Sequence, residues 1–234
     1  MITDCLVCAN NDCLIKRNIS EAKVLELSLR KRVMKVKKNK QFITEGAMVS
    51  GLFFIYTGVV KVYKTGLNDK EQILRFSRDG EIIGYRGFGI DSEYQIGSVV
   101  IEDTVLCFFS ISMLDELFHS VPKLTFDFMR FFSDELVKSE DKVRKIAQMT
   151  VREKVIDALL YVNRKFAQKN GAIGLKLSRK DIAGFAGTTE EQVIRVISSL
   201  DKEGILYKRG KQLAILDLDK SVSYTHLTLP TKRI

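Results

Sequence analysis

The chain has 234 residues, 45% of them hydrophobic and 29% charged, which is the composition of an ordinary globular protein long enough for two domains. Its formal net charge of +9 favours a polyanionic partner, either nucleic acid or a membrane surface. The chain contains no run of about 18 apolar residues that could span a membrane, and its first residues lack the basic and apolar regions of a signal peptide. We therefore expect a cytoplasmic protein with no membrane segment.

The four cysteines are unevenly placed. Cys5, Cys8 and Cys13 follow a C-x2-C-x4-C pattern, whereas Cys107 lies in a distant apolar segment. Thiols stay reduced in the cytoplasm, so such a group is more often a metal site or redox sensor than a set of disulfides. Three close thiols and one remote thiol could hold an iron–sulfur cluster, and four thiolates could also bind zinc. The alternative is a disordered tail of free thiols, with Cys107 a core residue.

The next part of the chain predicts one short helix and then an all-β domain. Residues 20–29 can form a helix that Ser20 caps. From residue 33 to 110, short β-branched and aromatic segments, such as 52–56 and 59–63, alternate with glycine. This spacing favours a β-roll or barrel.

A long helix is predicted over residues 119–149. No glycine occurs from Ser112 to Gln168, and apolar residues recur at spacings of three, four and seven. The helix could pack on its own β domain, or it could form a dimer seam, because it is longer than the face that one small domain can cover. The apolar positions assigned to the seam are Leu124, Phe128, Phe131, Phe132, Leu136, Val143 and Ile146.

Two further helices with distinct end signals are predicted after the long helix. The first covers residues 150–166, and the C-cap sequence 169–171 follows it. A capping box over residues 178–181 begins the second, which ends before Gly187.

The glycine turn leads into a helix that Thr188 or Thr189 caps, and then into a hairpin over residues 204–215 with a basic tip. Helix, tight turn, helix and basic hairpin are typical of a winged helix-turn-helix. The residues expected to face the core from the last helix are Val193, Val196, Ile197 and Leu200.

The opposite face of that helix would then read bases in the major groove. Arg195 would pair with guanine, Glu191 with cytosine and Gln192 with adenine, while basic wing residues would contact phosphates. The alternative is a generic helical pair whose polar residues only keep it soluble. The predicted DNA-binding residues are Thr188, Thr189, Glu190, Glu191, Gln192, Arg195, Lys208, Arg209 and Lys211.

A β-roll, a long helix and a winged helix-turn-helix in this order resemble the CRP/FNR family of bacterial transcription regulators. The resemblance is strongest over residues 152–217, notably in the stretches 164–168 and 177–183. It implies an α+β fold with an amino-terminal cyclic-nucleotide-binding-like β-roll, a long dimerisation helix and a carboxy-terminal winged helix-turn-helix. It also implies a homodimer that is not an enzyme, binds double-stranded DNA at an inverted repeat and contacts RNA polymerase.

Within the family, the FNR branch holds a [4Fe-4S] cluster through amino-terminal cysteines and one cysteine on a late strand. Residues 105–108, followed by 113–117, resemble the segment around that remote ligand, and Asp141 resembles an acidic position that opposes dimerisation when the cluster is lost. The spacing between the second and third cysteines is one residue shorter than the FNR pattern. The resemblance implies a sensor of oxygen, nitric oxide or redox state whose cluster ligands are Cys5, Cys8, Cys13 and Cys107.

The chain departs from other branches of the family. The stretches 84–86 and 94–98 lack the Arg-Ser pair that holds the phosphate of cAMP, so we do not expect cAMP to bind. Glu191 and Arg195 keep the Glu-x-x-x-Arg pattern of the family's recognition helix. Glu190 and Ile194 differ from the residues that the family has at these two positions, so the outer bases of the half-site are expected to differ from those of family operators.

The motifs do not exclude every other function. Two other functions stay open: a cluster-free regulator whose β-roll senses a small molecule or haem, and an iron–sulfur electron carrier.

Residues 223–232 resemble translated sequencing-adapter sequence, so the end of the chain is expected to be non-native. The expected parts are a cysteine-rich cluster segment (1–19), a β-roll sensor domain (20–118), a dimerisation helix (119–149), a winged helix-turn-helix (150–220) and a non-native tail (221–234).

Overall fold

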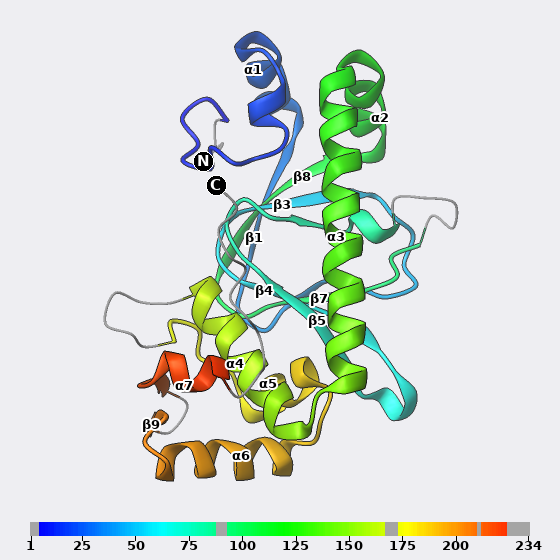
Figure 1. The fold of residues 1–234 in the computed structure, drawn as a ribbon. Coiled ribbons are helices and arrows are strands. Elements are labelled where there is room, and N and C mark those ends of the chain that lie inside the picture. The colour runs from blue at the N-terminus through cyan, green and yellow to red at the C-terminus, as the bar shows by residue number, and fades with distance from the viewer. Residues whose placement is uncertain (1–4, 88–92, 167–172, 210–211, 224–234) are drawn as a thin grey trace. The chain divides into compact units, whose positions relative to one another are not determined.

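The computed structural model describes residues 5–87, 93–166, 173–209 and 212–223. The chain divides into two compact units, residues 1–138 and residues 139–234, which we describe separately. Figure 1 shows the helices and strands of each unit. Within the described ranges, no helix is both long enough and apolar enough to cross a membrane.

The first unit begins with the cysteine segment, a 3-10 turn η1 (Lys16–Asn18) and helix α1 (Glu21–Arg30). Ser20 is the N-cap of α1, as predicted, but its side chain makes no capping hydrogen bond. Its backbone carbonyl accepts the N–H of Val24 at 2.9 Å instead. One face of α1 is buried in the unit through Val24 and Leu27.

Two four-stranded antiparallel sheets form the body of the first unit, which confirms the predicted β-roll. Because side chains alternate along a strand, Leu106 and Cys107 on neighbouring positions of β8 enter two different hydrophobic clusters. The first sheet has the order β1 (Arg32–Val36), β8 (Thr104–Ser110), β3 (Gly51–Thr57) and β6 (Ile82–Ile83). The second has the order β2 (Gln41–Ile43), β7 (Gly97–Val100), β4 (Val60–Thr65) and β5 (Glu71–Ser77), and the turns η2 (Leu67–Asp69) and η3 (Tyr85–Gly87) complete the unit.

Two helices follow the sheets. Helix α2 (Ile111–Ser120) begins at Ser110, whose side chain accepts the N–H of Met113, and α3 (Pro122–Gln148) begins at a proline, a favoured first position. The long helix is therefore confirmed, with a start at residue 122 in place of 119.

The structure corrects the residues assigned to the dimer seam of α3. Leu124 and Phe128 are only 1% and 6% exposed, because they pack in the core of their own unit. Phe131 and Phe132 are partly buried against the same core. Leu124 and Phe128 therefore hold α3 on the β-roll and are not available to a seam, whereas the assignment of the partly buried Phe131 and Phe132 to the seam stays a prediction. The large apolar side chains that α3 exposes are Phe126, Met129, Leu136, Val137 and Val143.

The second unit contains the end of α3, helix α4 (Val151–Phe166) and a helix-turn-helix. Helix α5 (Arg179–Ala186) begins at the predicted capping box of Ser178 and Asp181, and Gly187 ends it with a φ of 67°. The remaining elements are α6 (Glu190–Lys202), β9 (Leu206–Arg209), β10 (Gln212–Ile215) and α7 (Leu218–Ser223). The winged helix-turn-helix is thereby confirmed, while the C-cap sequence 169–171 lies outside the described residues.

The expected boundary of the non-native tail, at residue 221, falls inside α7 and stays a prediction. Ser221 is 3% exposed and belongs to α7, where its hydroxyl donates to the carbonyl of Asp217 at 2.7 Å. Residues 224–234 lie outside the described part of the chain.

Candidate metal centre and nucleic-acid interface

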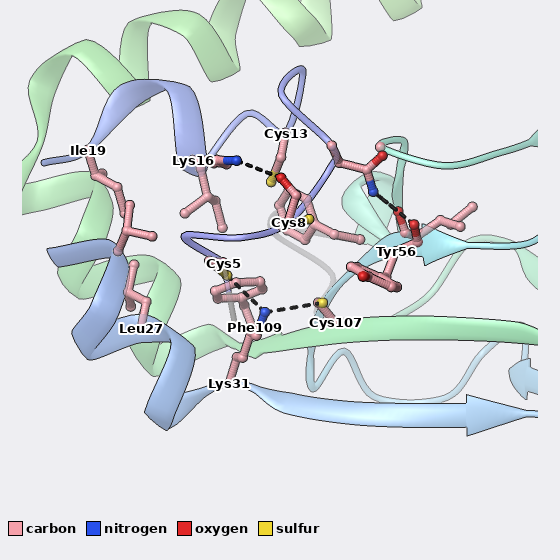
Figure 2. Close-up of a pocket in the computed structure, with 16 residues that line it drawn as sticks. Cys5, Cys8, Cys13, Lys16, Ile19, Leu27, Lys31, Tyr56, Cys107 and Phe109 are labelled. Carbon is pink, nitrogen blue, oxygen red and sulfur yellow. Dashed lines mark hydrogen bonds between the residues drawn. The ribbon is translucent and has the colours of Figure 1, made fainter. Parts of the chain in front are cut away.

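The four cysteines line one pocket of the first unit. Cys5, Cys8 and Cys13 come from the amino-terminal segment. Cys107 comes from β8, and its side chain faces that segment (Figure 2). Cys107 is 7% exposed, and the two flanking strands pair it with Val33 of β1 and Phe54 of β3. The fold thus brings together the near and remote thiols that the sequence singled out.

Hydrogen bonds fasten the amino-terminal segment to the β-roll and to α1. The side-chain amide of Asn10 donates to the carbonyl of Tyr56 on β3 at 2.9 Å (Figure 2). The N–H of Cys5 donates to the hydroxyl of Ser28 on α1 at 2.9 Å. Leu14 and Ile15 are buried in the same hydrophobic cluster as Cys107. The described part of the segment is therefore a packed part of the unit, in contrast to a disordered tail.

Lys31 is the charged residue of this pocket that contacts sulfur. Its ammonium donates to the sulfur of Cys5 at 2.8 Å and to the sulfur of Cys107 at 3.5 Å (Figure 2). Burial lowers the pKa of Lys31, but the hydrogen bond and charge of Cys5 and the charge of Cys107 outweigh it and raise that pKa above its ordinary value. The ammonium is therefore charged at neutral pH.

For Cys13, in contrast to Lys31, the surroundings favour the neutral form of the side chain. Burial raises the pKa of its thiol, and the backbone N–H groups of Lys16 and Ile15 offset this only in part. Without a metal the thiol of Cys13 is thus neutral at pH 7. Binding of a metal would release that proton.

The donor set of the pocket can be compared with the two metal centres that the sequence left open. Among the described residues, no group of three or more His, Cys, Asp or Glu side chains is arranged to hold a single metal ion. A structural zinc ion needs four ligands that converge on one point. A four-iron cluster binds each thiolate through a different iron, so its ligands surround it. Four cysteines around one pocket are a donor set that fits a four-iron cluster.

Helix α6 presents the side chains that the sequence assigned to DNA. Glu191, Gln192 and Arg195 are exposed on it. On the inner face Val193, Ile197 and Leu200 are buried as predicted, whereas Val196 is only half-buried. Thr189, not Thr188, is the N-cap.

Several of the predicted DNA contacts have partners within the protein. The side-chain oxygen of Gln192 accepts the N–H of Thr189 in a capping box, and the hydroxyl of Thr188 also contacts it. In this structure Gln192 thus stabilises the helix start, and its pairing with adenine stays a prediction. Lys208 lies 3.0 Å from the hydroxyl of Ser198 and 3.6 Å from the carboxylate of Asp201. Lys211 and the Arg209 side chain lie outside the described part of the structure.

Each unit matches the model of a known protein family. Residues 153–220 match the Crp-like helix-turn-helix domain, and residues 33–120 match the cyclic nucleotide-binding domain. The chain belongs to the CRP/FNR family. Members of the CRP/FNR family are transcription regulators that bind DNA through the helix-turn-helix, and they are not enzymes.

Relatives of this CRP/FNR protein include regulators of anaerobic metabolism. Electron transport regulator A of Shewanella oneidensis is 28% identical over 187 residues, which cover 78% of this chain and 74% of that protein. The Fumarate and nitrate reduction regulatory protein of Escherichia coli is 24% identical over 219 residues, which cover 92% of this chain and 87% of that protein. The structure of FixK2 from Bradyrhizobium japonicum shares the fold, with a TM-score of 0.76 at 22% identity over 85% of this chain and 99% of that chain.

Sequence reasoning missed two residues of the cysteine pocket in this CRP/FNR protein. Asn10 and Lys31 both line it, together with the four cysteines. Lys31 directly follows α1, and nothing in its sequence neighbourhood distinguishes it from the other lysines nearby. Asn10 lies between Cys8 and Cys13, and this position is the only signal that could have indicated it.

Proposed function

We propose that this CRP/FNR regulator senses oxygen or nitric oxide through a [4Fe-4S] cluster bound by Cys5, Cys8, Cys13 and Cys107. The observation that carries the proposal is that the three amino-terminal cysteines and the remote cysteine of β8 line one pocket. The cluster would supply bonds between the amino-terminal segment and β8 that oxidants can break. The name of a further relative, the Anaerobic regulatory protein of Pasteurella multocida, supports the same class of signal.

The chain's own residues would connect this site to dimerisation. Cys107 shares its hydrophobic cluster with Leu124 and Phe128 of α3, so packing around the cysteines reaches the long helix. On α3, Met129, Leu136 and Val143 are exposed at intervals of seven residues, the repeat of a helix–helix seam. A second copy of the chain would cover this stripe, and the two recognition helices α6 would then read an inverted repeat next to RNA polymerase.

Asp141 is less suited to the repulsive role that the resemblance implied. Its carboxylate contacts Arg144 and also lies 3.2 Å from the ammonium of Lys145. Burial raises the pKa of Asp141, but these two cations outweigh it and lower that pKa. The charge of Asp141 is therefore balanced within its own helix, and it would contribute little repulsion across a dimer.

Anaerobic purification tests the cluster. The wild-type protein should show sulfur-to-iron charge-transfer absorption and hold iron and acid-labile sulfide in equal amounts. Cys107→Ala should lose both, whereas Val105→Ala, on the same strand but outside the pocket, should retain them. An iron-free wild type that dimerises and binds its operator in air would overturn the cluster and favour a β-roll that senses a small molecule or haem.

Binding to DNA gives an independent test of the regulator. Contacts to phosphates release counterions, so the affinity for an inverted-repeat operator should fall steeply as salt rises. An iron–sulfur electron carrier would show no such binding.

A further inference from the structure

The junction between α1 and β1 places the Lys31 side chain against the cysteines. Lys31 is the C-cap of α1, and its backbone N–H donates to the carbonyl of Leu27 at 2.9 Å. The next residue begins β1, which pairs with β8 so that Val33 lies opposite Cys107. The end of α1 before Lys31 and the pairing of β1 with β8 after it together determine the position of the Lys31 backbone.

The surroundings of the Lys31 ammonium call for a negatively charged partner. Lys31 is 7% exposed, and burying an unpaired charge costs several kcal/mol. In the described part of the chain, the side-chain contacts of this ammonium are the sulfurs of Cys5 and Cys107, and no carboxylate is within ion-pair distance. A thiolate accepts a hydrogen bond from an ammonium more strongly than a neutral thiol does, so an anionic sulfur at either position would compensate this buried charge.

We propose that Lys31 is the charge-compensating residue of the cysteine centre, and that its ammonium stabilises the anionic, iron-bound form of Cys5 and Cys107. This proposal rests on the cluster proposed above and adds a fifth residue to that site. Four thiolates give a [4Fe-4S] centre a net negative charge, and hydrogen bonds to the sulfurs are a main determinant of its reduction potential. Lys31 is a positioning residue that acts through its two cysteines.

Lys16 provides a matched control in the same pocket. Its ammonium donates to the carbonyl of Cys8 at 2.6 Å and to the side-chain oxygen of Asn11 at 3.3 Å, and neither contact is to sulfur (Figure 2). Lys16→Met therefore removes one positive charge from the pocket lining but leaves both sulfur hydrogen bonds of Lys31 intact. Lys31→Met removes the sulfur contacts with a side chain of similar length.

The experiment compares wild type, Lys31→Met, Lys31→Arg and Lys16→Met after anaerobic reconstitution with iron and sulfide. Three quantities are measured: iron content, the rate at which the charge-transfer absorption disappears in air, and the midpoint potential of the cluster. We expect Lys31→Met to lose the absorption roughly 10-fold faster than wild type. Its midpoint potential should also be lower, because an added electron is no longer compensated. Lys31→Arg should be intermediate, and Lys16→Met should change all three quantities less than Lys31→Met does.

The iron-free proteins separate this role from a merely structural one. In the iron-free protein the described side-chain contacts of the Lys31 ammonium are two sulfurs, and replacing a buried charged group by an apolar side chain is often neutral or stabilising. The thermal midpoint of iron-free Lys31→Met should therefore equal or exceed that of iron-free wild type.

Each other outcome contradicts the proposal in a recognisable way. A Lys31→Met protein that matches wild type in iron content, air stability and potential overturns the role of Lys31 and leaves the cluster in place. A marked fall in the thermal midpoint of the iron-free variant shows that Lys31 serves the fold. A wild type that takes up no iron and sulfide overturns the cluster itself, and the role of Lys31 with it.

Discussion

Arg75 on β5 forms an ion pair with Glu135 on α3, with 3.0 Å between the guanidinium and the carboxylate. The hydroxyl of Tyr85 donates to the same carboxylate, and the ammonium of Lys138 lies 2.9 Å from its other oxygen. Glu135 is 9% exposed, so this is a buried polar contact between the β-roll and the long helix. It fixes the rotation of α3 on the roll, and Leu136, the next residue, consequently points outward.

Removing the charge of Glu135 should destabilise the first unit. In Glu135→Gln the partly buried guanidinium of Arg75 loses its anionic partner, which typically costs about 1–3 kcal/mol in the free energy of unfolding. Denaturant unfolding measures this difference. Glu140→Gln on the exposed side of the same helix is the control, and its effect should stay within about 0.5 kcal/mol. Equal effects of the two substitutions would show that the buried pair contributes nothing.

The same pair predicts a specific dependence of stability on pH. Burial raises the pKa of Glu135, but Arg75, Tyr85 and Lys138 outweigh it and hold that pKa below its ordinary value of 4.5. Since the folded-state pKa is the lower one, the stabilisation is complete above pH 4.5 and is lost as the pH falls through the folded-state pKa. The difference in unfolding free energy between wild type and Glu135→Gln should therefore shrink with acidification below that pH. A difference that is constant from pH 7 to the acid transition would contradict this assignment.

The elements predicted correctly are those with local signals. The capping box of Ser178 and Asp181 and the left-handed Gly187 are both readable from a few neighbouring residues, and the helix-turn-helix follows from them. The β-roll was predicted from the spacing of glycine and β-branched segments. The cysteine pocket was predicted in part, because the pattern of thiols is visible although its geometry is not.

The errors concern contacts between residues far apart in the chain. The role of Lys31 depends on the pairing of β1 with β8, a register that no stretch of sequence specifies by itself. The apolar positions predicted for the seam of α3 include Leu124 and Phe128, which are buried in the core of their own unit, as well as Leu136 and Val143, which are exposed. Periodicity shows that such a helix is amphipathic, but the β-roll decides which face it covers.

The exposed stripe of α3 predicts the effect of two substitutions on oligomeric state. Leu136→Glu places a charge on the stripe and should yield a monomer with unchanged circular dichroism. Phe128→Ala removes a core side chain and should instead lower the unfolding free energy by about 3–5 kcal/mol. Sedimentation of the anaerobic protein distinguishes the two. A Leu136→Glu protein that remains dimeric would place the interface elsewhere.

The exposed face of α6 predicts how individual bases are read. Arg195 is exposed on the recognition helix, where its guanidinium could donate two hydrogen bonds to one guanine. Arg195→Ala should weaken operator binding by about 1–3 kcal/mol and should abolish the preference for guanine at one position of each half-site. Fluorescence anisotropy at one fixed salt concentration, with operators that carry each base at that position, measures both effects.

Arg195→Lys separates base reading from charge. Lysine keeps the positive charge but lacks the planar fork that pairs with guanine, so it should restore part of the affinity without restoring the preference. Gln192→Ala is expected to behave differently, because Gln192 closes the capping box of α6. Its loss should weaken binding to all operators alike, through fraying of the helix start. If Arg195→Lys kept the full preference for guanine, Arg195 would be a phosphate contact, and another side chain of α6 would read the base.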